Sequence, residues 1–151
     1  MIKDILKTAL ISLALGFLLE LSGIWLKTSF LQEFFKNNLV TILVALLAIN
    51  ATTMGIILSK IRDLIDKHGG DEFFKNTKKS MLISIQEQIG LIIAATIVLA
   101  AKSSEVIKQI DNLPLLLNSI TTAIFIYALL VLYDIAKGVL IIVEYDIPSD
   151  K

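Results

Sequence analysis

The sequence contains no cysteine, one histidine and two prolines among its 151 residues. Without cysteine the chain can form no disulfide, no thiolate nucleophile and no metal site with sulfur ligands. The single His68 belongs to no HxxxH or HxxE pattern, which argues against a histidine-based metal centre. We therefore expect neither a resident metal nor a cofactor.

Catalytic motifs are also missing. The chain has no Ser–His–Asp set, no Walker loop and no glycine-rich phosphate cradle, since Gly69-Gly70 alone is too short for one. Fourteen basic and fourteen acidic residues give a net charge of zero, so no overall field attracts nucleic acid or acidic substrates. We expect a protein that is not an enzyme.

Long apolar runs dominate the sequence instead. Hydrophobic residues make up 56% of the chain, charged residues only 19%, and the mean hydropathy is +0.80. A helix of about 20 apolar residues, at about 1.5 Å per residue, crosses a hydrocarbon core of about 30 Å. The sequence therefore predicts a single all-α, polytopic membrane domain over residues 1–151, with four transmembrane helices at about 7–26, 39–58, 81–101 and 115–133.

The distribution of basic residues predicts the orientation. The two chain ends and the segment 59–80 carry ten Lys and Arg residues, whereas the two remaining connections carry four. The positive-inside rule then places both termini and segment 59–80 in the cytoplasm, with the chain in the inner (plasma) membrane. We expect the second helix to run on to His68, Gly69-Gly70 to form the turn and Asp71 to cap the third helix. Segment 59–80 would thus be a cytoplasmic helical hairpin.

The connection Lys27–Asn38 leaves two interpretations open. It mixes charged residues with apolar Phe30, Leu31 and Phe35. This mixture is typical of an amphipathic turn in the headgroup region, and it fits equally a segment folded over the outer mouth of the bundle.

Two of the predicted spans carry a stripe of small residues at helical spacing. Small residues let helices approach closely in lipid, so such faces are expected to be buried in protein, and copies of the chain are expected to assemble symmetrically around them. The stripe of the first span is Ala9, Ser12, Gly16, Glu20, Gly23 and Lys27, and that of the second span is Thr41, Ala45, Ala48, Thr52, Gly55 and Ser59.

Polar residues at membrane depth are the candidate ion path. A buried carboxylate is unfavourable in a bilayer unless it is hydrated, hydrogen-bonded or protonated, and an assembly of copies around a pore would hydrate it. Two other interpretations stay open. The amides can instead join helices by hydrogen bonds, and a glutamate near the interface can extend its side chain to the headgroups. The candidate residues are Glu20, Asn50, Gln86, Glu87 and Gln88.

The hairpin is the candidate control element. Its basic residues suit an anionic ligand such as a nucleotide, an anionic lipid headgroup, or a soluble regulatory protein, and the topology alone also explains them. Lys75, Lys78 and Lys79 share one helix face by their spacing, and Lys67 and His68 end the preceding helix.

Two families resemble parts of this pattern. The segment ELSGIWLKTS, with Glu20, Gly23, Lys27 and Ser29, resembles the opening of the small multidrug resistance transporters. That resemblance implies a four-span proton antiporter in which Glu20 binds a cationic drug. In those transporters the lysine lies one residue further on, and a second buried glutamate such as Glu87 is lacking.

The architecture as a whole is similar to the small four-span, pore-forming effectors of bacterial anti-phage systems. That similarity implies an oligomeric ion channel of the inner membrane that a nucleotide signal controls. We therefore expect a homo-oligomeric ion channel. The alternatives are a proton-coupled cation or drug transporter that uses Glu20, and a membrane scaffold that recruits a cytoplasmic partner through residues 59–80.

Overall fold

The computed structural model describes residues 2–68, 71–110 and 112–144, and every regular element among them is a helix. The elements are α1 (Ile2–Trp25), α2 (Phe30–His68), α3 (Asp71–Ser103), α4 (Glu105–Lys108) and α5 (Leu113–Glu144). Four of these helices are long and apolar enough to cross a bilayer, over Lys3–Trp25, Phe30–Asp66, Lys75–Ser103 and Leu113–Leu140. The prediction of an all-α chain with four helices long and apolar enough to span a membrane is confirmed for the described residues.

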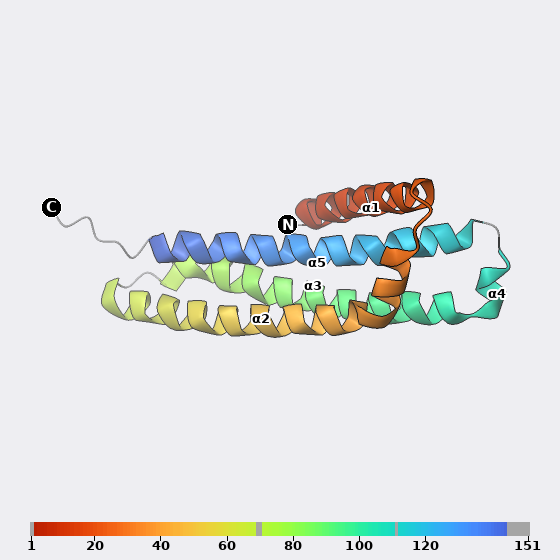
Figure 1. Cartoon of the computed structure of the whole chain (residues 1–151). Helices are drawn as coiled ribbons and strands as arrows, with labels where there is room; N and C mark the ends of the chain where they lie inside the picture. The colour runs from red at the N-terminus through yellow and green to blue at the C-terminus, as the bar shows by residue number, and fades with distance from the viewer. Residues whose placement is uncertain (1, 69–70, 111, 145–151) are drawn as a thin grey trace.

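The four long helices form an elongated bundle around α5 (Figure 1). Helix α1 packs against α5, while α2 and α3 pack against each other and against α5. The turn between α2 and α3 lies at one end of the bundle, which we call the hairpin end, and α4 lies at the other end, the α4 end (Figure 1).

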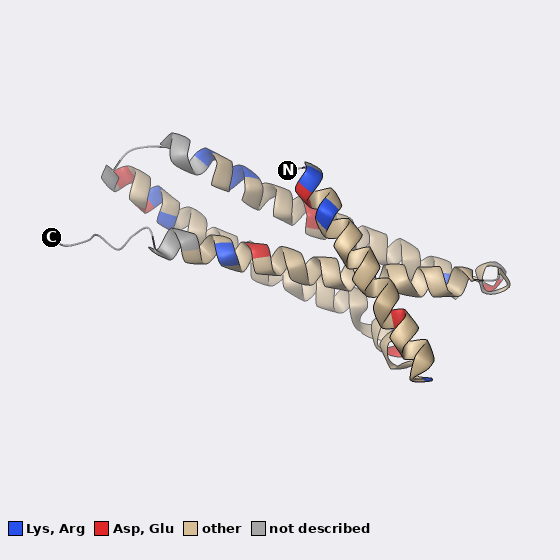
Figure 2. Ribbon diagram, turned by 90° about the horizontal axis from the view of Figure 1, so that it is seen from above, with Lys and Arg blue, Asp and Glu red and all other residues tan. Residues whose placement is uncertain are grey.

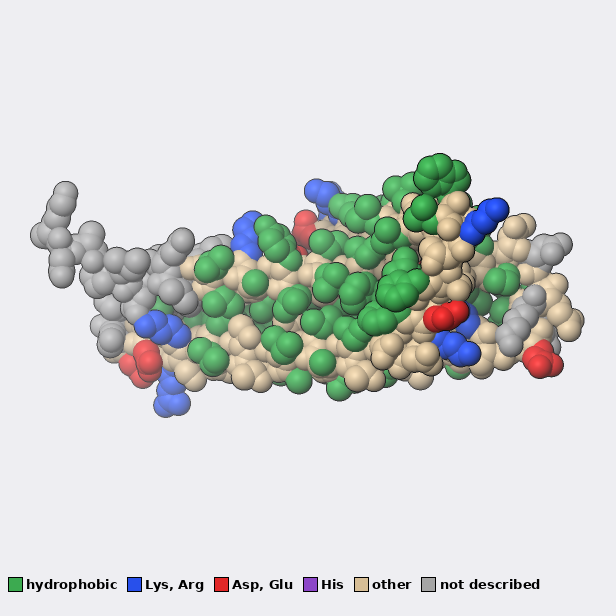
Figure 3. Space-filling view, in the orientation of Figure 1, with side chains coloured by type: hydrophobic (Ala, Val, Ile, Leu, Met, Phe, Trp, Pro, Cys, Tyr) green, Lys and Arg blue, Asp and Glu red, His purple; other side chains and the backbone are tan. Residues whose placement is uncertain are grey.

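Polarity varies along the bundle as a bilayer requires. Lys and Arg gather towards the hairpin end and beside the N-terminus, and the stretch from there towards the α4 end carries few charges (Figure 2). Apolar side chains gather over the middle of the face shown in Figure 3. The exposed apolar side chains of the chain include Leu10, Phe17, Val44, Ile56 and Ile93. Large apolar side chains exposed in this number are stable only in lipid, so this is a membrane protein.

The connection between α1 and α2 is shorter than predicted. The sequence suggested a connection over 27–38, but the structure continues α2 back to Phe30. Helix α1 ends in a Schellman motif: Lys27 takes a left-handed conformation (φ 52°), and the Thr28 amide donates to the Gly23 carbonyl at 3.0 Å. Ser29 then donates from its hydroxyl to the Glu33 carboxylate at 2.9 Å, which fixes the first turn of α2.

The segment 30–38 therefore belongs to a transmembrane helix and to the core. Phe35 is buried and lies 5.1 Å, ring centre to ring centre, from Phe125 of α5. It belongs to the apolar cluster at the α4 end, which we call cluster 1. The buried members of cluster 1 are Phe35, Leu39, Leu43, Ala95, Ile124 and Ala128.

Other helix boundaries agree with the sequence. Helix α2 ends at His68 and α3 begins at Asp71, as predicted, so the second and third spans do continue into a helical hairpin. The turn residues Gly69 and Gly70 lie outside the described part of the chain. A second apolar cluster, cluster 2, lies nearer this end and consists of Met54, Tyr127, Val131 and Ile135.

The two small-residue stripes differ in burial. On α1 the buried residues are Ser12, Gly16 and Glu20, and this face packs on α5, as the sequence predicted. At Gly16 the backbones approach so closely that a Cβ would lie 2.6 Å from the Ser119 carbonyl oxygen. On α2, by contrast, all six residues of the stripe Thr41, Ala45, Ala48, Thr52, Gly55 and Ser59 are exposed on the outer surface of the chain.

Candidate functional site: an acidic cavity among four helices

A cavity of about 280 Å³ opens among α1, α2, α3 and α5, in the half of the bundle nearer the hairpin end. Its apolar walls come mainly from Ile5, Ile57, Val131 and Ile135. Regular helical spacing builds its polar walls, because residues three or four apart lie on one face of a helix. On α3 these residues are Thr77, Ser80, Ser84 and Glu87, and on α5 they are Tyr127, Asp134 and Gly138.

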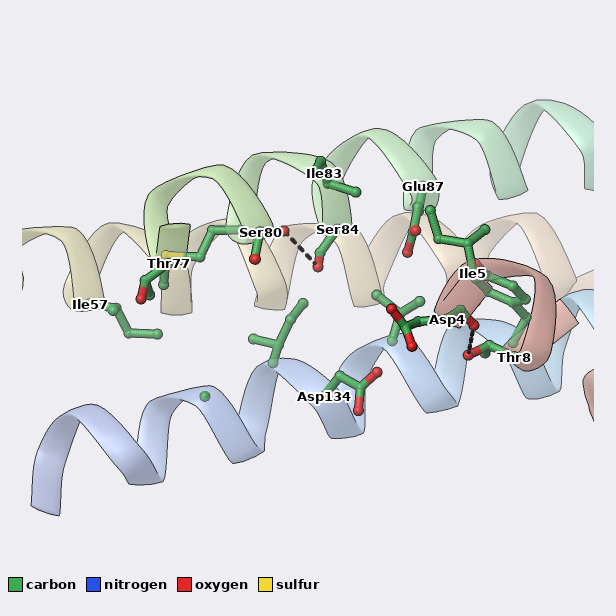
Figure 4. Close-up of a pocket in the computed structure, with 15 residues that line it drawn as sticks. Asp4, Ile5, Thr8, Ile57, Thr77, Ser80, Ile83, Ser84, Glu87 and Asp134 are labelled. Atoms are coloured by element: carbon green, nitrogen blue, oxygen red, sulfur yellow. Dashed lines mark hydrogen bonds between the residues drawn. The ribbon is translucent and has the colours of Figure 1, made fainter. Parts of the chain in front are cut away.

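Three carboxylates from three helices meet at this cavity. Asp4 of α1, Glu87 of α3 and Asp134 of α5 line it, and in Figure 4 all three side chains extend into the space between the helices. Among the described residues no lysine or arginine lines the cavity, and Lys7 attracts the Asp4 carboxylate from outside it. Glu87 and Asp134 repel each other electrostatically, and a cation between them would relieve that repulsion.

The hydroxyl groups of the cavity present oxygen lone pairs to it. The Ser84 hydroxyl donates its proton to the Ser80 carbonyl at 3.1 Å, and the Thr8 hydroxyl donates to the Asp4 carbonyl at 3.0 Å (Figure 4). A hydroxyl whose proton is engaged in this way is an acceptor towards other neighbours. Oxygen acceptors and carboxylates together are the surroundings that hard cations, protons and water prefer.

The three carboxylates are not arranged as a direct metal site. Among the residues that the structure describes, no group of three His, Cys, Asp or Glu side chains has the geometry to hold a metal ion.

Comparison of the chain with protein-family models, with curated proteins and with solved structures found no match.

The structure separates the predicted ion-path residues. Of the five, only Glu87 lines the cavity. Gln86 is exposed on the outer surface of α3, and Asn50 and Gln88 are fully buried. Glu20 lies beyond cluster 1, towards the α4 end.

Glu20 is enclosed by partners. Its side chain is 3% exposed, and it accepts hydrogen bonds from the Thr122 hydroxyl at 3.0 Å and from the Gln32 side-chain amide at 3.1 Å. Lys102 attracts the same carboxylate electrostatically. These contacts join α1, α2 and α5, so Glu20 connects helices in this structure.

Several residues described above were not predicted from the sequence. Asp4 and Asp134 stand near span ends, where charged residues normally mark an interface, and no local pattern joins them across 130 residues. The spacing of Thr77, Ser80, Ser84 and Glu87 was the available signal, because it places three hydroxyls on the face of a membrane carboxylate. Gln32 was missed because it stands in the segment read as a connection.

The predicted control residues lie at the hairpin end. Lys75, Lys78 and Lys79 are exposed on one face of α3, as their spacing indicated. Lys67 and His68 form the end of α2, and their side chains lie outside the described part of the structure.

Proposed function

We propose that the protein conducts cations across a membrane and that the acidic cavity is where cations enter. The observation that carries this proposal is the lining of the cavity, where Glu87 and Asp134 repel each other and hydroxyl oxygens of three helices lie beside them. Such a lining concentrates cations and repels anions. Two of its carboxylates, Asp4 and Asp134, lie near the ends of their spans, where water reaches them, which suits a water-filled entrance.

Cluster 1 supports a gated rather than an open path. It fills the interior between the cavity and Glu20 with packed apolar side chains, including Phe35, Leu39 and Leu43. Apolar constrictions stop ions because they cannot replace the hydration shell. We infer that conduction requires these side chains to separate, which a shift of α2 relative to α5 would accomplish.

The exposed stripe on α2 supports assembly of several copies. Its small residues would let a neighbouring helix approach closely, and in the described part of the chain they are exposed. We propose a symmetric homo-oligomer in which this face of α2 contacts another copy. Exposed Gln86 would find hydrogen-bonding partners more easily in such an assembly than in lipid.

The orientation and the setting rest on the sequence. The excess of Lys and Arg at the hairpin end and the chain ends places that end in the cytoplasm, and the cavity then opens to the cytoplasmic side of the inner membrane. Control by an anionic nucleotide or a soluble protein at Lys75, Lys78 and Lys79, as in anti-phage effectors, stays a prediction. The enclosed state of Glu20 supports the channel over a transporter that binds its substrate at Glu20.

Cation flux into liposomes tests the proposal. Purified protein is reconstituted, and K⁺ and H⁺ fluxes are followed with ion-sensitive dyes. Glu87→Gln and Asp134→Asn are expected to lower the flux at least several-fold, because each removes a carboxylate from the cavity. Glu105→Gln is the matched control, since Glu105 is an exposed glutamate of α4 outside the cavity. Wild-type flux in both cavity variants, with correct folding, would overturn the proposal.

A further inference from the structure

Two amide side chains meet the interior of the bundle at the same depth. Asn50 lies about five turns before the end of α2, and Gln88 lies about five turns after the start of α3. Since α2 and α3 form an antiparallel hairpin, both residues stand at about the same distance from its turn. Asn50 is 0% exposed and Gln88 is 2% exposed.

Along their helices these amides lie between the residues of the two apolar clusters. On α2, Asn50 stands between Leu43 of cluster 1 and Met54 of cluster 2. On α3, Gln88 stands between Ile85, which packs on cluster 2, and Ala95 of cluster 1. Asn50 and Gln88 thus lie between the cavity and cluster 1 along the bundle.

Neither amide has a hydrogen-bond partner among the described residues. The unpaired atoms are Nδ2 and Oδ1 of Asn50 and Nε2 and Oε1 of Gln88. Ser12 of α1, which is 1% exposed, has an unpaired hydroxyl as well. Buried polar groups without partners are strongly unfavourable, and proteins normally satisfy them.

The chemistry of the amides selects their ligand. Each amide offers both a donor NH₂ and an acceptor oxygen, so a ligand that satisfies both must itself accept and donate. A bare cation would satisfy only the oxygens, and an apolar molecule would satisfy neither group. Water satisfies both, and buried waters typically make about three such hydrogen bonds.

We propose that Asn50 and Gln88 form an internal water-binding site at the middle of the membrane domain. The site extends the hydrated region of the acidic cavity inward to the surface of cluster 1. Its role in ion passage rests on the proposed function, whereas its hydration does not. A cation that leaves Glu87 would there meet amide oxygens and water before it reaches the apolar constriction.

Hydroxyl-radical footprinting tests the hydration of this site in the intact protein. Radicals generated by a millisecond X-ray pulse oxidise side chains that lie next to bound water. Met54, one turn from Asn50, is 3% exposed, and Met81 lines the cavity, so the same chain carries a probe and an internal reference. We expect wild-type Met54 to be oxidised at a rate within a few-fold of that of Met81.

The variant Asn50→Leu/Gln88→Leu removes the polar groups while keeping the volume similar. Oxidation of Met54 should then fall at least fivefold relative to Met81. Gln88→Leu alone is the second variant if the double variant does not fold, and a fall of at least twofold is expected. An unlabelled Met54 in the wild type, or equal labelling in wild type and variants, would overturn the water site.

Flux measurements on the same variants separate the two proposals. If the site belongs to the ion path, the double variant should lose at least tenfold in cation flux while Glu87 and Asp134 remain in place. Unchanged flux together with lost labelling would overturn its role in the path and leave the cavity proposal standing. If Glu87→Gln leaves the cation flux unchanged, the proposal that cations enter through the cavity is contradicted, whatever the oxidation rate of Met54.

Discussion

Glu20 and Glu87 are the same residue type in opposite halves of the membrane domain, and the structure treats them differently. Glu20 is enclosed and accepts two hydrogen bonds from two other helices. Glu87 is only partly buried and lies in a cavity beside a second carboxylate that repels it. The surroundings of a carboxylate, more than its presence in a span, thus distinguish a residue that joins helices from one that is available to an ion.

The two halves also differ in how their helices approach. Around Glu20, the small residues Ser12 and Gly16 let α1 lie directly on the backbone of α5, which leaves no room for solvent. Around Glu87 the helices leave a cavity between them, and hydroxyl-bearing and β-branched side chains line it. The predictions below test this contrast, beginning with the largest change in stability.

Gly16→Leu should disrupt the packing of α1 on α5 in the half of the bundle that contains Glu20. A Cβ at this position would lie 2.6 Å and 2.8 Å from backbone atoms of Ser119 and Ala123, which cannot turn aside. We expect α1 to move away from α5 and the free energy of unfolding to fall by about 3 kcal/mol. Titration with dodecyl sulphate in mixed micelles, followed by near-ultraviolet circular dichroism, measures the change.

Gly90→Leu is the matched control for this prediction. A Cβ at Gly90 meets nothing within 4 Å, and Gly90 lies outside the stripe proposed to join copies of the chain. The variant should therefore stay within about 0.5 kcal/mol of the wild type in micelles. A loss at Gly90 as large as that at Gly16 would contradict the close α1–α5 contact.

Glu20→Gln should lower the free energy of unfolding by about 2 kcal/mol. The new amide keeps one acceptor oxygen, so one of the donors Thr122 and Gln32 faces an NH₂ group instead. The same titration measures the loss. Adding Gln32→Glu restores a donor–acceptor pair between α1 and α2, and it should recover at least half of that loss. If the double variant is no more stable than the single one, the hydrogen bond to Gln32 contributes nothing.

Lys27→Gly should stabilise the end of α1, near Glu20, and raise the free energy of unfolding by about 0.5–1 kcal/mol. Lys27 holds a left-handed conformation at which glycine is free of strain. The unfolding midpoint in mixed micelles should rise. Lys27→Ala removes the same charge but keeps the Cβ, so an equal gain from alanine would show that charge, and not backbone strain, was relieved.

Glu87→Gln should have the smallest effect on stability, within about 0.5 kcal/mol. The amide has the same shape, faces open space and no longer repels Asp134. The identical substitution at Glu20 and at Glu87, measured side by side, is the sharpest form of the comparison. Equal losses at both positions would show that Glu87 also joins helices, and the contrast between the halves would disappear.

Much of the fold follows from local sequence. Span length and hydropathy predict the four helices, and Gly69-Gly70 with Asp71 predicts the limits of the hairpin at His68 and Asp71. The stripe of Ser12, Gly16 and Glu20 predicts the face by which α1 packs. Each of these signals lies within one or two helical turns, where backbone geometry alone relates the residues.

The remainder depends on contacts that no local pattern encodes. The helical start of α2 was missed because Lys27 takes a conformation that usually calls for glycine. The cavity was missed because it needs Asp4 and Asp134, and their meeting depends on how α1 lies across α5. Spacing along one helix cannot supply that angle, since packing between distant helices sets it.

The contact between Glu20 and Thr122 also bears on how the chain is made. The two residues are 102 positions apart, and ribosomes add about 5–20 residues per second, so the carboxylate waits about 5–20 s for its partner helix. During that interval α1 has a polar face and no α5 to cover it. Until α5 is made, the Glu20 carboxylate can accept its hydrogen bond from Gln32 of α2, which is only 12 positions away.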